Sequence, residues 1–317
     1  MTITKDSSAP LVAVVGIAGV QGGSVVKELA ESSKSYRVRG FTRDATKPAA
    51  QARAKQGVEV VTVSIVVENK DEVYKAFAGA DVAFLVTDYW EHMDMEREIN
   101  EGKLQIDAAK AGGVKRIVWS GMPSFKIISN GKYTNIEDCE GKFVVSEYGR
   151  ASGVPFVDVQ AGYYGTTVFS LPILIGDKQA DGTYDMPWPV HPTTVLPFID
   201  ATHDYGLFVR HVLELPTFPD GQTVVAYGEK ITLQDMAAQL AKGTGKPVTF
   251  KEITPDQFKT NLGTMGLPAS LHDRMAAAWG ALADFGWEVT NTHDGLPRKP
   301  RSWAEFVAHA DWSKALA

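Results

Sequence analysis

The sequence is poor in cysteine, has no long apolar run and carries no excess of basic residues. Its 317 residues include one cysteine, Cys139, so no disulfide can form within the chain, which fits a reducing compartment. No apolar stretch approaches the roughly 20 residues that cross a bilayer, and the polar leader at residues 1–10 lacks the apolar core of a secretion signal. The formal net charge is −6, without a basic patch or arm. We therefore expect a cytoplasmic protein, with a nuclear fraction left open, that binds neither membranes nor nucleic acid directly.

Two familiar catalytic patterns are also missing. The seven histidines have no paired spacing typical of metal ligands, so we expect no metal site; they lie at positions 92, 191, 203, 211, 272, 293 and 309. No Gly-x-Ser-x-Gly elbow is present, which argues against hydrolase chemistry of that type.

What the sequence does contain is a strand, a glycine-rich turn and the start of a helix near its N-terminus. Leu11–Val15 is a short apolar run rich in valine, as expected for a parallel strand covered on both faces. Gly16, Gly19 and Gly22 follow in the spacing G-x-x-G-x-x-G, which suits a tight turn, close backbone approach to a pyrophosphate and close helix packing. The helix predicted over 24–29 would turn its free N–H groups toward the phosphates. The pattern predicts a dinucleotide site; the alternative is a glycine turn without a ligand.

The residues after the second predicted strand, 37–41, indicate which dinucleotide is preferred. A cofactor with a free ribose 2′-hydroxyl usually meets an Asp or Glu there, whereas this chain has Thr42, Arg43 and Lys47. Two cations suit a 2′-phosphate, so NADP(H) is favoured over NAD(H). Asp44, beside Arg43, is the one residue that argues the other way.

Strand and helix patterns alternate along the first half of the chain. The pattern predicts further strands at 58–63, 83–87, 115–120 and 156–160, with helices at 69–78, 91–111 and 140–152. This alternation is typical of a doubly wound parallel sheet. We therefore expect an α/β fold with a Rossmann-type NADP(H)-binding domain over residues 11–162.

Residues 163–317 differ in texture and are expected to form mainly a smaller α/β substrate-side or partner-side region. Prolines at 172, 187, 189, 192 and 197 predict irregular loops over the carboxyl edge of the sheet. A helix near 198–213 is expected to return to the Rossmann domain. Strands at 224–227 and 248–253 and helices at 232–242 and 255–262 are assigned to the smaller region. Tryptophans at 279, 287, 303 and 312 are interpreted as core and lid packing.

Several segments together resemble the NmrA-like branch of the atypical short-chain dehydrogenases. They are GIAGVQGG at 16–23, which includes Val20 and Gln21, TR at 42–43, FLVTDYWE at 84–91, WSG at 119–121, Lys142, EY at 147–148 and SGVP at 152–155. The resemblance extends from about residue 11 to about residue 310. It looks especially close to the fungal members and to the animal member described as an NADPH sensor.

The resemblance implies roles for individual residues. The three turn glycines would hold the pyrophosphate, while Arg43 and Lys47 would hold the 2′-phosphate. Thr87 and Tyr89 would lie along the ribose and nicotinamide half of the cofactor. Lys142 matches the helix lysine that, in reductase relatives, contacts the nicotinamide ribose and assists proton transfer; the alternative is a solvated helix lysine.

The proton-donating centre departs from the pattern of ordinary short-chain dehydrogenases. Those enzymes place a tyrosine four residues before the lysine, where this chain has Asp138. Ser120 matches their catalytic serine in position. Tyr163 and Tyr164, or a water held by Asp138, are the candidate substitutes for the missing donor. The alternatives are aromatic packing for the tyrosines and a polar helix start for Asp138.

Two functions therefore stay open. The first is a redox-sensing regulatory protein that binds NADPH or NADP⁺ and reports its state to a protein partner through the Pro-rich loops. The second is an NADPH-dependent reductase that uses Lys142 on a small carbonyl, imine or alkene, including aromatic substrates. Loss of a proton donor typically lowers a rate by about 10² to 10⁴, which favours the first function. The resemblance also allows a homodimer.

Overall fold

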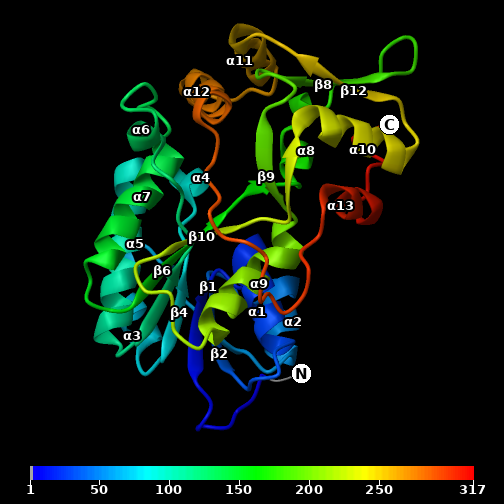
Figure 1. Ribbon diagram of the computed structural model, residues 1–317. Helices are drawn as coiled ribbons and strands as arrows, with labels where there is room; N and C mark the ends of the chain where they lie inside the picture. The colour runs from blue at the N-terminus through cyan, green and yellow to red at the C-terminus, as the bar shows by residue number, and fades with distance from the viewer. Residues whose placement is uncertain (1–2) are drawn as a thin grey trace.

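The computed structural model, in which residues 3–317 are described, is built around a seven-stranded parallel sheet (Figure 1). Its strand order is β10-β6-β5-β4-β1-β2-β3. The strands are β1 (Leu11–Val15), β2 (Arg37–Thr42), β3 (Glu59–Thr62), β4 (Val82–Leu85), β5 (Arg116–Trp119), β6 (Phe156–Ala161) and β10 (Thr223–Ala226). The strand order reverses between β1 and β4, and ligands bind at such switch points in open α/β sheets. The predicted doubly wound parallel sheet is confirmed.

Helices cover both faces of this sheet because its central strands are apolar on both sides. In β1, Val12 and Val14 face one hydrophobic core, while Leu11, Ala13 and Val15 face the other. The first core includes residues of α1 (Val20–Ala30) and α9 (Ala201–Glu214). The second includes residues of α3 (Lys70–Phe77), α5 (Met95–Ala111) and α7 (Glu137–Arg150). A further helix, α2 (Pro48–Lys55), follows β2.

The rest of the chain forms a second body of structure above the carboxyl ends of the sheet, in the upper half of Figure 1. It contains a three-stranded sheet of order β11-β9-β7 and a two-stranded sheet of β12 and β8. Their bounds are β7 (Tyr163–Tyr164), β8 (Tyr184–Trp188), β9 (Val195–Ile199), β11 (Glu229–Thr232) and β12 (Val248–Glu252). Its helices include α8 (Thr167–Ser170), α10 (Leu233–Thr244), α11 (Pro255–Thr264), α12 (Ala269–Phe285) and α13 (Trp303–His309). Their shared core includes Trp188, Trp279, Trp303 and Trp312.

The helix predicted over 91–111 is in fact two helices. The short α4 (Tyr89–His92) ends at Met93, which has a left-handed backbone with φ 53°, and α5 begins two residues later. Asp94 caps α5, because its side chain accepts a hydrogen bond of 3.0 Å from the Arg97 amide. The break gives α4 a direction of its own at the end of β4.

The Pro-rich segment is less irregular than predicted, because β8 and β9 lie within it. Pro187 is tolerated in β8 because that strand pairs on one side only, with β12. Pro197 lies in β9 at a position that β7 does not reach, since β7 pairs only with Phe198 and Ile199. Phe198 and Ile199 therefore end strand β9. The returning helix α9 begins after Asp200, later than the predicted start at residue 198.

The strand predicted at 224–227 does not belong with the smaller region. It is β10, and it extends the large sheet by pairing in parallel with β6. The hydrophobic pattern of a segment does not indicate which of the three sheets it joins.

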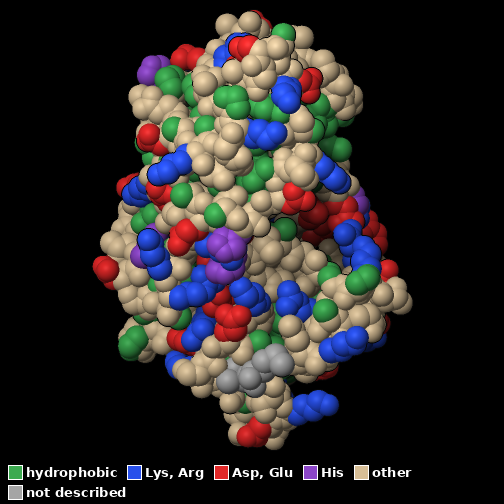
Figure 2. Space-filling view, turned by 90° about the vertical axis from the view of Figure 1, so that its right-hand side faces the viewer, with side chains coloured by type: hydrophobic (Ala, Val, Ile, Leu, Met, Phe, Trp, Pro, Cys, Tyr) green, Lys and Arg blue, Asp and Glu red, His purple; other side chains and the backbone are tan. Residues whose placement is uncertain are grey.

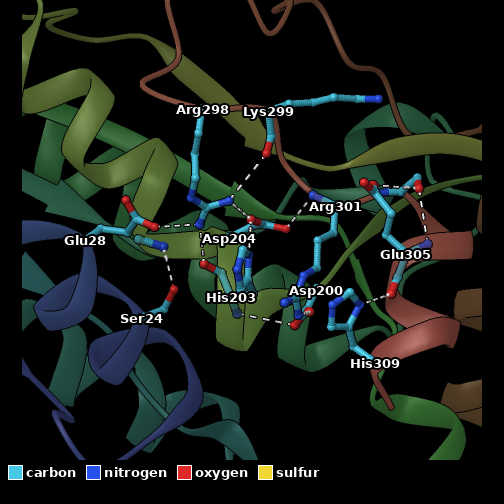
Figure 3. Close-up of polar contacts among 12 residues, drawn as sticks. Ser24, Glu28, Asp200, His203, Asp204, Arg298, Lys299, Arg301, Glu305 and His309 are labelled. Atoms are coloured by element: carbon cyan, nitrogen blue, oxygen red, sulfur yellow. Dashed lines mark hydrogen bonds and ion pairs between the residues drawn. The ribbon is translucent and has the colours of Figure 1, made fainter. Parts of the chain in front are cut away.

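A strap formed by residues 286–302 leaves α12, descends beside α9 and returns to α13 (Figure 1). Arg298 on this strap points between α1 and α9 (Figure 3), where its guanidinium pairs with Glu28 and Asp204, each at 2.5 Å. Both carboxylates are almost completely buried. The ion pairs join the C-terminal part of the chain to the helix that follows the glycine turn.

The surface shown in Figure 2 carries interleaved acidic and basic side chains, with apolar side chains scattered among them. Among residues 3–317, no helix has both the length and the apolar character to cross a membrane.

Candidate cofactor-binding site

A cleft of about 1050 Å³ opens at the carboxyl ends of β1, β2 and β4, where the strand order reverses. This volume is slightly above the usual range of about 300 to 1,000 Å³ for small-molecule sites. The residues assigned from the sequence to cofactor binding, and the proton-donor candidates Asp138, Tyr163 and Tyr164, line this cleft. These residues are Gly16, Gly19, Val20, Gln21, Gly22, Thr42, Arg43, Lys47, Thr87, Tyr89, Ser120, Asp138, Lys142, Tyr163 and Tyr164.

The glycine turn has the geometry that its spacing predicts. Gly16 has φ +71°, a conformation that favours glycine, and Gly19 is the N-cap of α1. A Cβ added to Gly22 would lie 2.4 Å from the Gly16 carbonyl oxygen and 2.5 Å from that of Val15. Only glycine lets α1 begin this close to β1, so the helix N-terminus is held at the floor of the cleft. The cradle therefore fits a pyrophosphate.

The corner after β2 holds the residues predicted to bind a 2′-phosphate. Arg43 and Lys47 both line the cleft, and the Arg43 guanidinium forms an ion pair with Glu91 of α4. The Asp44 carboxylate accepts hydrogen bonds from the Thr46 amide at 2.8 Å and the Thr46 hydroxyl at 2.6 Å. These bonds hold the pKa of Asp44 below its ordinary value. Asp44 is thus engaged by its own turn, while Arg43 is paired across the cleft.

Lys142 extends from α7 to the end of β4, and its ammonium group is fully engaged. The Nζ atom donates to the Thr87 carbonyl oxygen and the Thr87 hydroxyl, both at 2.8 Å, and to Glu98 Oε1 at 2.7 Å. The Thr87 hydroxyl in turn donates to the same Glu98 oxygen at 2.7 Å. An ammonium group has three donors, so all three are in use. Glu98 is buried, which makes this network a strong constraint on the lysine.

The three candidate proton donors lie around the inner part of the cleft. Burial raises the pKa of Asp138 above its ordinary value, and the nearby Arg274 guanidinium only partly offsets this effect. Burial also raises the pKa of Tyr163 and of Tyr164, whose hydroxyl accepts a hydrogen bond of 2.6 Å from Gln21 Nε2. A proton-donating tyrosine in an ordinary short-chain dehydrogenase needs a lowered pKa, so the environment of both phenols opposes that role.

Helix α4 forms one wall of the cleft and is fixed by a neighbour that the sequence did not suggest. The Tyr89 hydroxyl donates to Glu137 at 2.7 Å and accepts from Arg274 of α12. The Arg274 guanidinium also lies 4.5 Å from the Tyr89 ring centre and 5.2 Å from that of Trp90. Burial and the Glu137 bond raise the pKa of Tyr89 to about 12. Tyr89 is therefore a neutral, anchored wall residue.

Glu91 and Trp287 are among the wall residues that sequence reasoning missed. Glu91 was placed in a long helix, and nothing in the local pattern indicates that it would reach Arg43, 48 residues earlier. Trp287 was interpreted as packing, yet it lines the cleft with a buried indole N–H that has no hydrogen-bond partner among residues 3–317.

Ser120 and Cys139 are both buried. Ser120 lies at the base of the cleft and is 3% exposed. Cys139 is buried, and burial raises the pKa of its thiol well above the ordinary value, so the thiolate is disfavoured. Within residues 3–317, no three His, Cys, Asp or Glu side chains are grouped to hold a metal ion.

Comparison with known proteins assigns the sequence to a family and finds solved structures with the same fold. The sequence model of the NmrA-like family matches residues 8–307. An NmrA-like family domain-containing oxidoreductase of Aspergillus campestris is 29% identical over 311 residues, covering 92% of this chain and 89% of the relative. The solved structure of Nmra, a negative transcriptional regulator in complex with NAD, shares the fold with a TM-score of 0.78, 21% identity and coverage of 95% of both chains. An NADPH-dependent quinone oxidoreductase from Escherichia coli also shares it, with a TM-score of 0.76, 20% identity and coverage of 94% of this chain and 99% of the other. The chain belongs to the NmrA-like family.

Proposed function

We propose that the protein binds NADP(H) in this cleft. The glycine cradle would hold the pyrophosphate, and Arg43 and Lys47 the 2′-phosphate. Thr87, Tyr89 and Lys142 would line the ribose and nicotinamide half, where a ribose hydroxyl that accepts from Lys142 would replace one of its present acceptors. Support comes from the close approach of α1 to β1 and from two cations in one corner of the cleft. The solved relatives with bound NAD or NADPH have the same fold.

We propose further that the protein is a redox-sensing regulator. Two observations support this proposal. The Lys142 ammonium donates all three of its hydrogen bonds to Thr87 and Glu98, and Asp138 stands at the position of the tyrosine in ordinary short-chain dehydrogenases. The site is therefore better equipped to bind a cofactor than to deliver a proton. A ligand shifts a conformational equilibrium only if it binds the two conformations with different affinities. A redox sensor must therefore show this difference to a different extent for NADPH and for NADP⁺.

The test compares the affinities of the two redox forms by calorimetry and follows protease cleavage within residues 171–197 in each complex. We expect affinities that differ by at least fivefold and a cleavage rate that depends on the redox form. Equal affinities together with identical cleavage would contradict sensing by this protein.

The second candidate, an NADPH-dependent reductase, is favoured by Trp287. Within residues 3–317 its buried indole N–H has no hydrogen-bond partner, and such a donor suits an acceptor such as a carbonyl oxygen. NADPH would supply the hydride, and Asp138, with its raised pKa, could hold the proton. Trp287 also borders an adjoining cavity of about 540 Å³.

A panel of carbonyl, imine and alkene compounds, assayed by NADPH absorbance with wild type and Lys142→Ala, separates the two candidates. The regulator predicts no turnover in either protein and weaker NADPH binding in the variant. Turnover that disappears in Lys142→Ala would establish the reductase instead.

A further inference from the structure

Arg43 is predicted to bind the 2′-phosphate, yet its guanidinium is already paired with a carboxylate. Its partner Glu91 lies on α4, which follows β4, whereas Arg43 follows β2. Since β1 lies between β2 and β4, the ion pair crosses above the end of β1, over the start of the glycine turn. Both side chains line the cleft.

Glu91 is held in this position by its neighbours on α4. Asp88 caps the helix by accepting a hydrogen bond of 3.1 Å from the Trp90 amide, and Tyr89 is buried with its hydroxyl between Glu137 and Arg274. The carboxylate therefore projects toward Arg43 from a fixed wall. Lys47 lines the same corner and has no ion pair within 4.0 Å among residues 3–317.

We propose that Glu91 is a specificity-determining residue, an internal competitor that occupies Arg43 until a 2′-phosphate displaces it. The inference rests on the proposed binding of NADP(H) and assigns its control to this residue. A phosphate that approaches Arg43 must break the Arg43–Glu91 pair and meets repulsion from the carboxylate. A cofactor with a free 2′-hydroxyl makes no such demand and leaves the pair intact. Glu91 thus reduces the preference for NADP(H) over NAD(H).

The expected effect is moderate because both side chains are partly exposed: Arg43 is 57% and Glu91 35% exposed. Pairs of this kind change an equilibrium constant by up to about fivefold, and removal of the repulsion acts in the same direction. In Glu91→Gln we therefore expect NADP⁺ to bind about five- to tenfold more tightly. NAD⁺ affinity should change by less than about twofold.

The experiment is calorimetric titration of NADP⁺ and NAD⁺ into wild type, Glu91→Gln, Arg43→Ala and the double variant. The control is Glu59→Gln, which removes the charge from an ion pair of 3.0 Å with Arg39 of β2, the strand that precedes Arg43. Neither Glu59 nor Arg39 lines the cleft. This control should leave both affinities unchanged. In the Arg43→Ala background, the increase in NADP⁺ affinity caused by Glu91→Gln should fall below about twofold, because no ion pair remains to be broken.

This inference would be overturned if the ratio of NADP⁺ affinity to NAD⁺ affinity were unchanged in Glu91→Gln but fell in Arg43→Ala. That result would still support the proposed cofactor site. A ratio that is insensitive to Arg43→Ala as well would instead overturn the assignment of the 2′-phosphate to Arg43.

Discussion

Arg298 gives the sharpest test of how the C-terminal strap stabilises the fold. Its guanidinium pairs with Glu28 of α1 and Asp204 of α9, whose side chains are 1% and 0% exposed, and it donates to the His203 carbonyl oxygen at 2.7 Å. In Arg298→Ala two buried carboxylates lose their main counter-ion. Removing one partner of a buried ion pair typically costs about 3 to 5 kcal/mol.

Residual partners place the expected loss at the lower end of that range. Arg210 lies 3.8 Å from Glu28, and the Arg301 amide still donates to Asp204 at 2.8 Å. We therefore expect Arg298→Ala to lower the free energy of unfolding by about 3 kcal/mol. Its neighbour Lys299 is exposed, and Lys299→Ala should change the free energy by less than about 0.5 kcal/mol.

Urea unfolding followed by circular dichroism measures both variants. Adding Glu28→Gln to Arg298→Ala should recover part of the loss, because a neutral amide is less costly to bury than an unpaired carboxylate. A loss below about 1 kcal/mol in Arg298→Ala, or no recovery in the double variant, would refute the idea that the strap is held by these charges.

Three further predictions follow from buried groups. Gly22→Ala should weaken NADP(H) binding at least tenfold and lower Tm, because its Cβ would clash with the backbone oxygens of Val15 and Gly16. The control is Gly263→Ala, where the nearest atom to the added Cβ is in a side chain at 3.5 Å. The same change in affinity and Tm in both variants would refute this explanation. Cys139 should react with Ellman's reagent only at the rate of unfolding, since its thiol is buried with a raised pKa; rapid labelling of the native protein would contradict this. Burial raises the pKa of Asp158 from 3.8 to about 6, so between about pH 4 and pH 6 the folded chain holds a proton that the unfolded chain has released. Its contribution to the free energy of unfolding should therefore fall by up to about 3 kcal/mol as pH rises through that range, and urea titrations of Asp158→Asn should lack this component.

The cofactor cleft was predictable because its residues lie close to strand ends. A glycine triplet after an apolar strand fixes its own local geometry, and parallel strands bring their carboxyl ends to one edge of the sheet. Candidates from Gly16 to Tyr164 therefore meet in one cleft without any knowledge of long-range contacts.

Contacts between distant segments were not predictable in this way. Arg43 meets Glu91, and Arg298 reaches Glu28 across 270 positions, because the folded path brings them together and no local pattern records it. The division of the predicted helix at Met93 was within reach of the sequence, since Asp94 followed by an apolar-periodic segment is a helix-start signal. The strands that contain Pro187 and Pro197 could not be predicted, because a strand tolerates proline only where the edge at that residue stays unpaired.

Calorimetric titration with NADPH, NADP⁺ and NADH tests whether the cleft binds NADP(H) through the glycine cradle and Arg43. The measurement is made on wild type and on Arg43→Ala. We predict saturable binding of NADPH to wild type, weaker binding of NADH, and a loss of at least tenfold for NADPH in the variant with little change for NADH. Absence of binding by all three nucleotides, or an NADPH affinity that is unchanged in Arg43→Ala, would contradict the account.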